Sequence, residues 1–142
     1  MQINPNEIIE KKILIPTGDT KVQQVGIDCT LAAALVLEPH SYANIAIAEK
    51  IALPDDVYME LKLRSSLARR GILMGCGLYD PGFHGDSGCI LHNLSGNKIV
   101  LAKGTRICQA VFYKANAASS YQGKYNNGGV EPYAAKEINN GN

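Results

Sequence analysis

The chain has 142 residues, of which 46% are hydrophobic and 19% charged, and its formal net charge is +1. This length suits one domain, and the near-zero charge argues against nucleic acid or an anionic membrane as a partner. No apolar run reaches the roughly 20 residues of a membrane-spanning helix, and no signal peptide is recognisable, so we expect a cytoplasmic protein.

Four cysteines stand far apart in the sequence and sit among apolar residues, namely Cys29, Cys76, Cys89 and Cys108. No Cys-X-X-Cys pair occurs, although such pairs are typical of zinc sites and redox motifs. We therefore expect buried free thiols in a reducing compartment rather than disulfides or a zinc site.

The N-terminal residues predict a short helix followed by a strand. Asn4 suits the N-cap, Pro5 the first helical position, and Glu7 the carboxylate position of a capping box. Residues 13–16, Ile-Leu-Ile-Pro, are typical of the end of a strand, and Thr-Gly-Asp at 17–19 is typical of a turn.

The next segment contains apolar stretches of two kinds. Residues 22–37 end in an Ala-rich run that fits either a helix or a buried strand, and Glu-Pro-His-Ser at 38–41 interrupts it. Residues 43–48 and 58–63 alternate in polarity, which indicates two half-buried strands, with Pro-Asp-Asp at 54–56 between them.

Residues 64–71, Arg-Ser-Ser-Leu-Ala-Arg-Arg-Gly, predict about one helical turn with Ser at its cap and Gly at its end. The free backbone amides at its start, together with Arg64, Ser65 and Ser66, could bind an anion. A capped surface turn explains the same residues equally well.

The stretch Gly77–Gly85 follows the apolar run 72–74 and precedes another at 89–91. Asp-Pro-Gly between two apolar runs favours a turn, since Pro fixes φ at the first corner and Gly permits a positive φ at the second. We expect the tip of a β-hairpin, with a carboxylate, an aromatic ring and uncovered backbone amides that could hold a flat polar ligand by its edge. A solvated turn is the alternative.

The remaining residues indicate further short strands. Turns at 95–97 and 103–105 flank strands at 98–101 and 106–112, and from 115 onward the sequence is polar and Gly-rich. Many short strands with regular turns predict an all-β sandwich or jelly roll.

Four islands together resemble the dUTPase / dCTP deaminase superfamily. They are Gly26-Ile27-Asp28, Arg64-Ser65-Ser66-Leu67-Ala68, Gly77 to Gly85, and Gly104-Thr105-Arg106-Ile107-Cys108-Gln109, in the order and approximate spacing of that superfamily. The resemblance implies an all-β, distorted jelly-roll or β-clip fold with one short helix, assembled as a homotrimer with active sites between subunits. Residues 1–130 would form the domain, with a C-terminal arm at about 115–130 that closes over the nucleotide, and 131–142 would be a flexible tail.

The resemblance also implies roles for individual residues. Asp80 would be catalytic and would orient or deprotonate the attacking water, and Asp28 would hold Mg²⁺ through water. The implied substrate-binding residues are Arg64, Ser65, Ser66 and Gln109 for the phosphates, Gly77 for the pyrimidine edge, Phe83 for the sugar, and Tyr121, Lys124 and Tyr125 in the arm.

The choice between the two chemistries of the superfamily depends on one position. Features such as Asp-Pro-Gly-Phe at 80–83 and the tail from Gly123 resemble deaminases, which carry a proton-shuttling Glu ten residues beyond this Asp. Here that position is Ile90, while Asn93 keeps the register, and no Glu occurs between Lys62 and Val130. We therefore predict a dUTP diphosphatase that releases dUMP and pyrophosphate. The alternatives are a dCTP deaminase or bifunctional dCTP deaminase-dUTPase, and a non-catalytic nucleotide-binding regulatory trimer.

Overall fold

The structure, a computed structural model, describes residues 1–127 and 136–137. The elements in chain order are α1 (Pro5–Glu10), β1 (Leu14–Ile15), β2 (Lys21–Val22), β3 (Ile27–Thr30), β4 (Leu35–Leu37), β5 (Ser41–Ala52), β6 (Val57–Leu63), α2 (Ser65–Ala68), β7 (Ile72–Gly75), β8 (His84–Asn93), β9 (Ile99–Leu101), β10 (Arg106–Lys114) and β11 (Lys136–Glu137).

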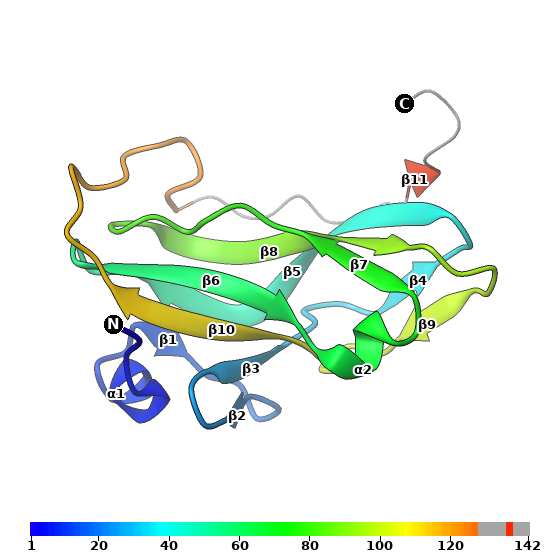
Figure 1. The fold of residues 1–142 in the computed structure, drawn as a ribbon, viewed down its shortest axis with the longest axis horizontal. Helices are drawn as coiled ribbons and strands as arrows, with labels where there is room; N and C mark the ends of the chain where they lie inside the picture. Colours follow the sequence, from blue (N-terminus) through cyan, green and yellow to red (C-terminus); the bar gives the residue numbers. More distant parts are fainter. Residues whose placement is uncertain (128–135, 138–142) are drawn as a thin grey trace.

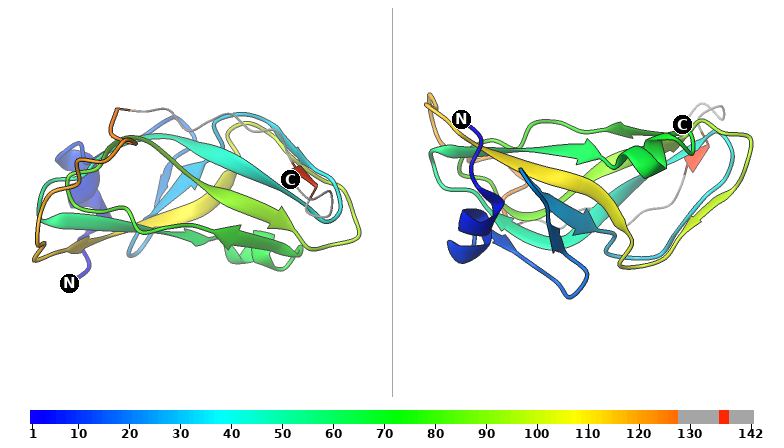
Figure 2. Two further views of the ribbon diagram at one scale, coloured as in Figure 1. Left: turned by 90° about the horizontal axis from the view of Figure 1, so that it is seen from above. Right: turned by 60° about the horizontal axis from the view of Figure 1, so that its bottom comes forward.

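These strands form two facing antiparallel sheets and a small ribbon. One sheet has the order β1-β5-β8-β7, with β11 also paired to β5, and the other has the order β2-β3-β10-β6. β4 and β9 form a separate two-stranded ribbon at one end of the molecule. Figures 1 and 2 show the two larger sheets as layers, with α1 and α2 at their margins. The all-β jelly-roll prediction is confirmed, with two short helices among the described residues instead of one.

The hydrophobic core lies between the two layers. Its fully buried large side chains are almost all aliphatic, and they come from both sheets and from α1, for example Ile8, Ile27, Ile47, Leu91 and Phe112. α2 adds Leu67, which is 4% exposed. Since alternate residues of a strand face one layer, the alternation predicted at 43–48 and 58–63 becomes the inner faces of β5 and β6.

The N-caps of α1 and α2 differ from those that the sequence predicted. The side chain of Asn4 accepts a hydrogen bond from the amide of Asn6, as an N-cap should, but Glu7 pairs with Lys11 one turn later instead of closing a capping box. In α2 the N-cap is Arg64, and no side chain caps the helix, so Ser65 lies inside the helix rather than at its cap.

Three further predictions from the sequence can be compared with the structure. The ambiguous run at 22–37 forms strands, including the fully buried β3 and the short β4. All four cysteines are free, but Cys76 is exposed and only the other three are buried. The predicted flexible tail, 131–142, lies outside the described residues except for the β11 pair. Over the described ranges, no helix is long and apolar enough to cross a membrane.

Candidate functional site

The connection between β7 and β8 is a wide loop and not the tight hairpin tip that the sequence suggested. β7 pairs with β8 only from Ile72↔Asn93 to Gly75↔Ile90, and the chain then leaves the sheet. It crosses to β6, where Tyr79 and Met59 exchange backbone hydrogen bonds of 3.1 and 3.0 Å. Among the residues that the structure describes, no strand therefore pairs with this edge of β8 in its first half, and we call it the unpartnered edge of β8.

The turn within this loop has the predicted chemistry. The amide of Phe83 donates to the carbonyl of Asp80 over 3.1 Å, and Gly82 between them has a φ of +88°. This is the geometry of a turn with Pro at the first corner and Gly at the second. The turn is fixed to the connection between β5 and β6, because the amide of Gly82 donates to the carbonyl of Pro54.

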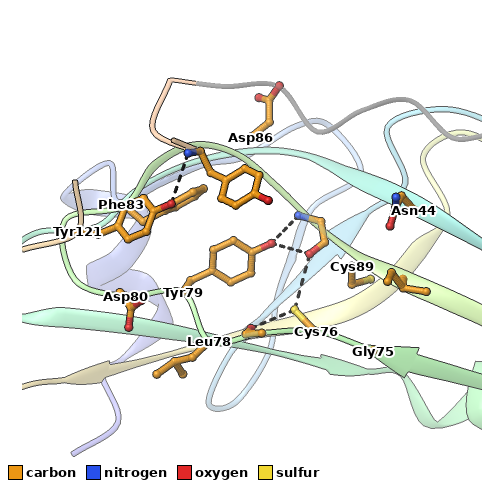
Figure 3. A pocket seen from close by; sticks show the side chains of 14 residues that line it. Asn44, Gly75, Cys76, Leu78, Tyr79, Asp80, Phe83, Asp86, Cys89 and Tyr121 are labelled. Carbon is orange, nitrogen blue, oxygen red and sulfur yellow. Dashed lines mark hydrogen bonds between the residues drawn. The ribbon is translucent and has the colours of Figure 1, made fainter. Parts of the chain in front are cut away.

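A cavity of about 670 Å³, which we call the loop cavity, lies between this loop and β8 (Figure 3). Its lining is mostly apolar or backbone, with Asp80 toward one end and Asn44 toward the other. The full set is Asn44, Gly75, Cys76, Gly77, Leu78, Tyr79, Asp80, Phe83, Asp86, Gly88, Cys89, Ile90, Tyr121 and Tyr125. An apolar hollow of this size with a few polar groups suits a small flat ligand.

Tyr79 and Gly88 face each other across the loop cavity. The Tyr79 hydroxyl donates to the Gly88 carbonyl at 2.5 Å and accepts from the Gly88 amide at 2.8 Å, which Figure 3 marks with dashed lines. Burial raises the pKa of this phenol, so the group is neutral and can donate and accept at once. The unpartnered edge of β8 is thus satisfied by a side chain of the same protein.

Cys76 lies beside this pair. Its thiol is directed at the carbonyls of Gly77 and Gly88, at 3.3 and 3.7 Å, and burial raises its pKa. A protonated thiol is a weak nucleophile, so this environment does not suit a catalytic cysteine.

The segment after β10 folds back on the loop of its own chain. The Tyr121 amide donates to the carbonyl of Pro81 at 2.8 Å, and the Tyr121 ring packs against Phe83 with 5.9 Å between centroids. Further along, Asn126 and Asn127 bond to the backbone of His84 at 3.0 and 2.9 Å. The described part of the predicted arm therefore rests in cis on the loop.

The predicted arm and sugar-binding residues occupy different positions within this arrangement. Phe83 is only 5% exposed, between the rings of Tyr79 and Tyr121, so a sugar reaches its face only when Tyr121 moves. Tyr125 is 60% exposed and also lines the cavity, while the Lys124 ammonium lies 5.1 Å from the Tyr125 ring centroid.

Asp80 is exposed and lies between two cavities. It lines the loop cavity and also a second cavity of about 570 Å³ beneath the start of the arm. A carboxylate at the rim of an apolar hollow can accept a proton from a water molecule held over the ligand.

A second polar group, which we call the arginine cluster, is built around Asp28 on β3. Its carboxylate is 3.1 Å from Arg106 and 3.7 Å from Arg64, and it accepts a hydrogen bond of 2.9 Å from Gln23. Asp28 is 2% exposed, whereas the two arginine side chains are each 32% exposed. The buried carboxylate thus fixes two guanidinium groups at the surface, and guanidinium groups suit phosphate oxygens.

Three other predicted phosphate ligands lie next to the arginine cluster. Gln109 on β10 pairs with Asp28 on β3, and the exposed Ser65 and Ser66 follow Arg64 directly at the start of α2. None of these residues lines the loop cavity. Within one chain the structure therefore gives two separate groups and does not join them into one site.

Asp28 does not fit a magnesium site by itself. Its carboxylate already has two cationic partners, and no group of three or more His, Cys, Asp or Glu that could hold a metal occurs in the part of the chain that the structure describes. Nearby arginines disfavour a divalent cation, so a metal role for Asp28 has no support from this geometry.

Comparison with known proteins identifies the family. The model of a family described as dCTP deaminase-like matches residues 31–115. The dCTP deaminase of Thermococcus gammatolerans is 35% identical over an alignment of 139 residues, which covers 85% of this chain and 88% of that protein.

The chain belongs to the dCTP deaminase-like family.

Solved structures show the same fold in both branches of the superfamily. The EIAV dUTPase has a TM-score of 0.63 and 22% identity, over 78% of this chain and 94% of that one. The dCTP deaminase from Agrobacterium tumefaciens has a TM-score of 0.64 and 17% identity, over 75% of this chain and 45% of that one. The superfamily prediction is confirmed, and the names of the relatives favour dCTP deaminase over our first choice of dUTP hydrolysis.

Sequence reasoning missed three residues that the structure places in the arginine cluster or the loop cavity, namely Arg106, Tyr79 and Gly88. Arg106 stands in one of the four islands, but the resemblance assigns it no role, and its ion pair with Asp28 depends on the pairing of β3 with β10. The sequence predicted no role for Tyr79, the residue before Asp80, although a buried Tyr hydroxyl usually has a hydrogen-bond partner. Gly88 stands directly before the apolar run 89–91, and a glycine within a strand can indicate close backbone approach.

Proposed function

We propose that this member of the dCTP deaminase-like family binds a deoxypyrimidine nucleoside triphosphate and hydrolyses dUTP to dUMP and pyrophosphate. The observation that carries the proposal is that Asp80 and Ile90 line the same cavity. Asp80 supplies a carboxylate at the rim, where it can orient or deprotonate a water that attacks the α-phosphate. Ile90 occupies the strand position at which the deaminase resemblance requires a Glu, and it cannot move a proton.

The loop cavity would hold the pyrimidine and the arginine cluster would hold the phosphates. Because the two groups do not meet in one chain, we propose that they meet across the interface of a homotrimer. Arg64, Ser65, Ser66 and Gln109 of one subunit would then contact the phosphates of a nucleotide whose base lies against Gly77 and its neighbours in another subunit. Two exposed guanidinium groups and free amides are suited to the charge of a triphosphate.

Magnesium would reach the site with the triphosphate and not through a metal centre of the protein. Mg²⁺ bound to a nucleotide keeps several waters and needs only one or two carboxylates from the protein. The arm would complete the site, with Tyr121, Lys124 and Tyr125 above the loop cavity, and its present docking on the loop fits a lid that closes over a ligand.

Product analysis tests this proposal. Purified protein is incubated with Mg²⁺ and either dUTP or dCTP, and the products are separated by chromatography. We expect dUMP and pyrophosphate from dUTP and no change in dCTP. Asp80→Asn should lower the hydrolysis rate by orders of magnitude and leave dUTP binding intact. Equal rates for wild type and Asp80→Asn would refute the role of Asp80.

Deamination of dCTP is the second candidate, and the name of the 35% identical relative favours it. In that case another group of the loop cavity must move the proton that Glu moves in the deaminases. Conversion of dCTP to dUTP or dUMP would establish this activity, alone or combined with hydrolysis. Binding of both nucleotides without turnover would instead support a regulatory nucleotide-binding trimer.

A further inference from the structure

The unpartnered edge of β8 offers one donor and one acceptor to the loop cavity. Pairing with β7 stops at Ile90, and in an antiparallel strand the amide and carbonyl of one residue point to the same side. Gly88 lies two residues before Ile90, and both of its backbone groups are directed at the Tyr79 hydroxyl. A cyclic amide such as a pyrimidine ring carries the complementary pair, an N–H next to a carbonyl oxygen.

Gly88 is held too tightly to carry any side chain. A Cβ at this position would lie 1.9 Å from the carbonyl oxygen of Ile45 on β5. Residue 88 therefore presents only backbone to the cavity, and its hydrogen-bonding pattern is fixed by the fold.

Tyr79 reproduces the contacts that such a ligand would make. A single phenol donates to the Gly88 carbonyl and accepts from the Gly88 amide, so it satisfies both buried groups at once. The backbone of Tyr79 is held by Met59, and its ring packs edge-on against Phe83 at 5.0 Å between centroids. Only side-chain rotation can free the edge of β8, because the backbone at residue 79 is anchored.

We propose that the Tyr79 hydroxyl is an internal competitor for the base-binding edge, so that a pyrimidine must displace it from Gly88 to bind. This inference rests on the proposed function, since it assigns the loop cavity to the nucleotide base. The competition sets both affinity and specificity. A ligand without an acceptor cannot replace the phenol without leaving the buried Gly88 amide unsatisfied, and a ligand without a donor leaves the Gly88 carbonyl with only the weak thiol donor of Cys76 at 3.7 Å.

Removing the hydroxyl tests the proposal directly. Wild type, Tyr79→Phe and Tyr113→Phe are titrated by calorimetry with the non-hydrolysable α,β-imido analogue of dUTP in the presence of Mg²⁺. Loss of one competing pair of hydrogen bonds should tighten binding to Tyr79→Phe by about tenfold. Tyr113, which stacks on Tyr58 on β6, is the matched control and should bind as wild type does.

The outcomes separate this inference from the proposed function. Equal or weaker binding by Tyr79→Phe, with normal binding by wild type, would overturn the competition and leave the nucleotide site standing. No binding by any variant would overturn the nucleotide site and this inference with it.

A measurement on the wild type keeps the test decisive if Tyr79→Phe does not fold. With NMR labels on the Tyr79 ring and the Gly88 amide, saturating analogue should shift both signals as the phenol leaves and the base takes its place. Binding that leaves both signals unchanged would show that Tyr79 stays on Gly88, and would refute the proposal.

Discussion

The arginine cluster and the loop cavity differ in the atoms from which they are made. The arginine cluster consists of charged side chains arranged around the buried Asp28, with the guanidinium groups of Arg64 and Arg106 at the surface. The loop cavity presents backbone edges and rings, and its central hydrogen bonds join Gly88 to Tyr79. The arginine cluster depends on charge balance, and the loop cavity depends on how closely β8 approaches β5. Different substitutions should therefore destabilise the two regions.

The largest effect is expected where strand approach is tightest. Gly88→Ala would place a methyl group against the Ile45 carbonyl of β5 and force the two strands apart, at a cost of about 3 kcal/mol of stability. Gly77→Ala, in the same cavity wall, meets nothing within 4 Å and should change stability little. Denaturant unfolding of the two variants measures the difference. Similar midpoints for both would mean that the β5–β8 contact is looser than the structure shows.

The arginine cluster should respond next, through charge. Asp28→Ala removes the only carboxylate bound to Arg64 and Arg106 in the described chain, and leaves Gln23 without its acceptor. Because the arginines are partly solvated, we expect a loss of about 2 kcal/mol, which is a fall in Tm of about 6 °C.

The control for this charge effect is a solvated pair. Glu38→Ala breaks the ion pair with Lys98, in which both side chains are more than half exposed, and should cost less than about 0.5 kcal/mol. A Tm for Asp28→Ala that matches Glu38→Ala would show that the two arginines do not depend on the buried carboxylate.

Alkaline pH should weaken the fold through its buried acids. Burial raises the pKa of Tyr79 and of the Cys29, Cys89 and Cys108 thiols, whose ordinary values are about 10 and about 8.5. The unfolded chain therefore ionises first as pH rises, and stability is complete below about pH 8 and falls above it. Tm measured from pH 7.5 to 10.5 should fall by several degrees. A flat profile would contradict buried, protonated thiols.

The smallest effect is expected at the arm. Asn126→Ala removes two side-chain hydrogen bonds: the one that joins the arm to the His84 amide at the start of β8, and the one to the Tyr121 carbonyl within the arm itself. The core does not depend on these bonds, so Tm should change by less than about 2 °C. Limited proteolysis after residue 117 should become faster. Unchanged cleavage would mean that the Tyr121 contacts and the hydrogen bond from the Ser120 hydroxyl to Asp55, of 2.7 Å, are enough to dock the arm.

The sequence predicts these two regions with unequal success, for a physical reason. The candidates Asp28, Arg64 and Gln109 are defined by their side chains, and residue types can be read directly from the sequence, so these candidates could be named in advance. The ion pairs of Asp28 could not, because they depend on β3 lying beside β10. The strands at 43–48 and 58–63 were predictable from alternation, since the period of two is a local property.

The loop cavity was harder to predict because its central hydrogen bonds involve the backbone amide and carbonyl of Gly88. Asp-Pro-Gly correctly indicated a turn, but where β7 leaves β8 depends on the distant contact between Tyr79 and Met59. The amide and carbonyl of Gly88 face the cavity because β7 pairs with β8 only as far as Ile90, and the extent of this pairing cannot be read from local sequence. Local patterns therefore located the loop and could not show that it encloses a cavity.

The close approach of Gly88 to β5 has a consequence for how this protein can be redesigned. Position 88 does not tolerate substitution, since every other residue would place a Cβ against the carbonyl oxygen of Ile45. If the loop cavity holds a nucleobase as proposed, a mutant library aimed at new nucleobases should keep this glycine and randomise position 79, whose side chain covers the backbone amide and carbonyl of Gly88. Under that proposal, differences in ligand choice between variants would arise from the side chain at position 79, next to Asp80, while the backbone of Gly88 stays the same.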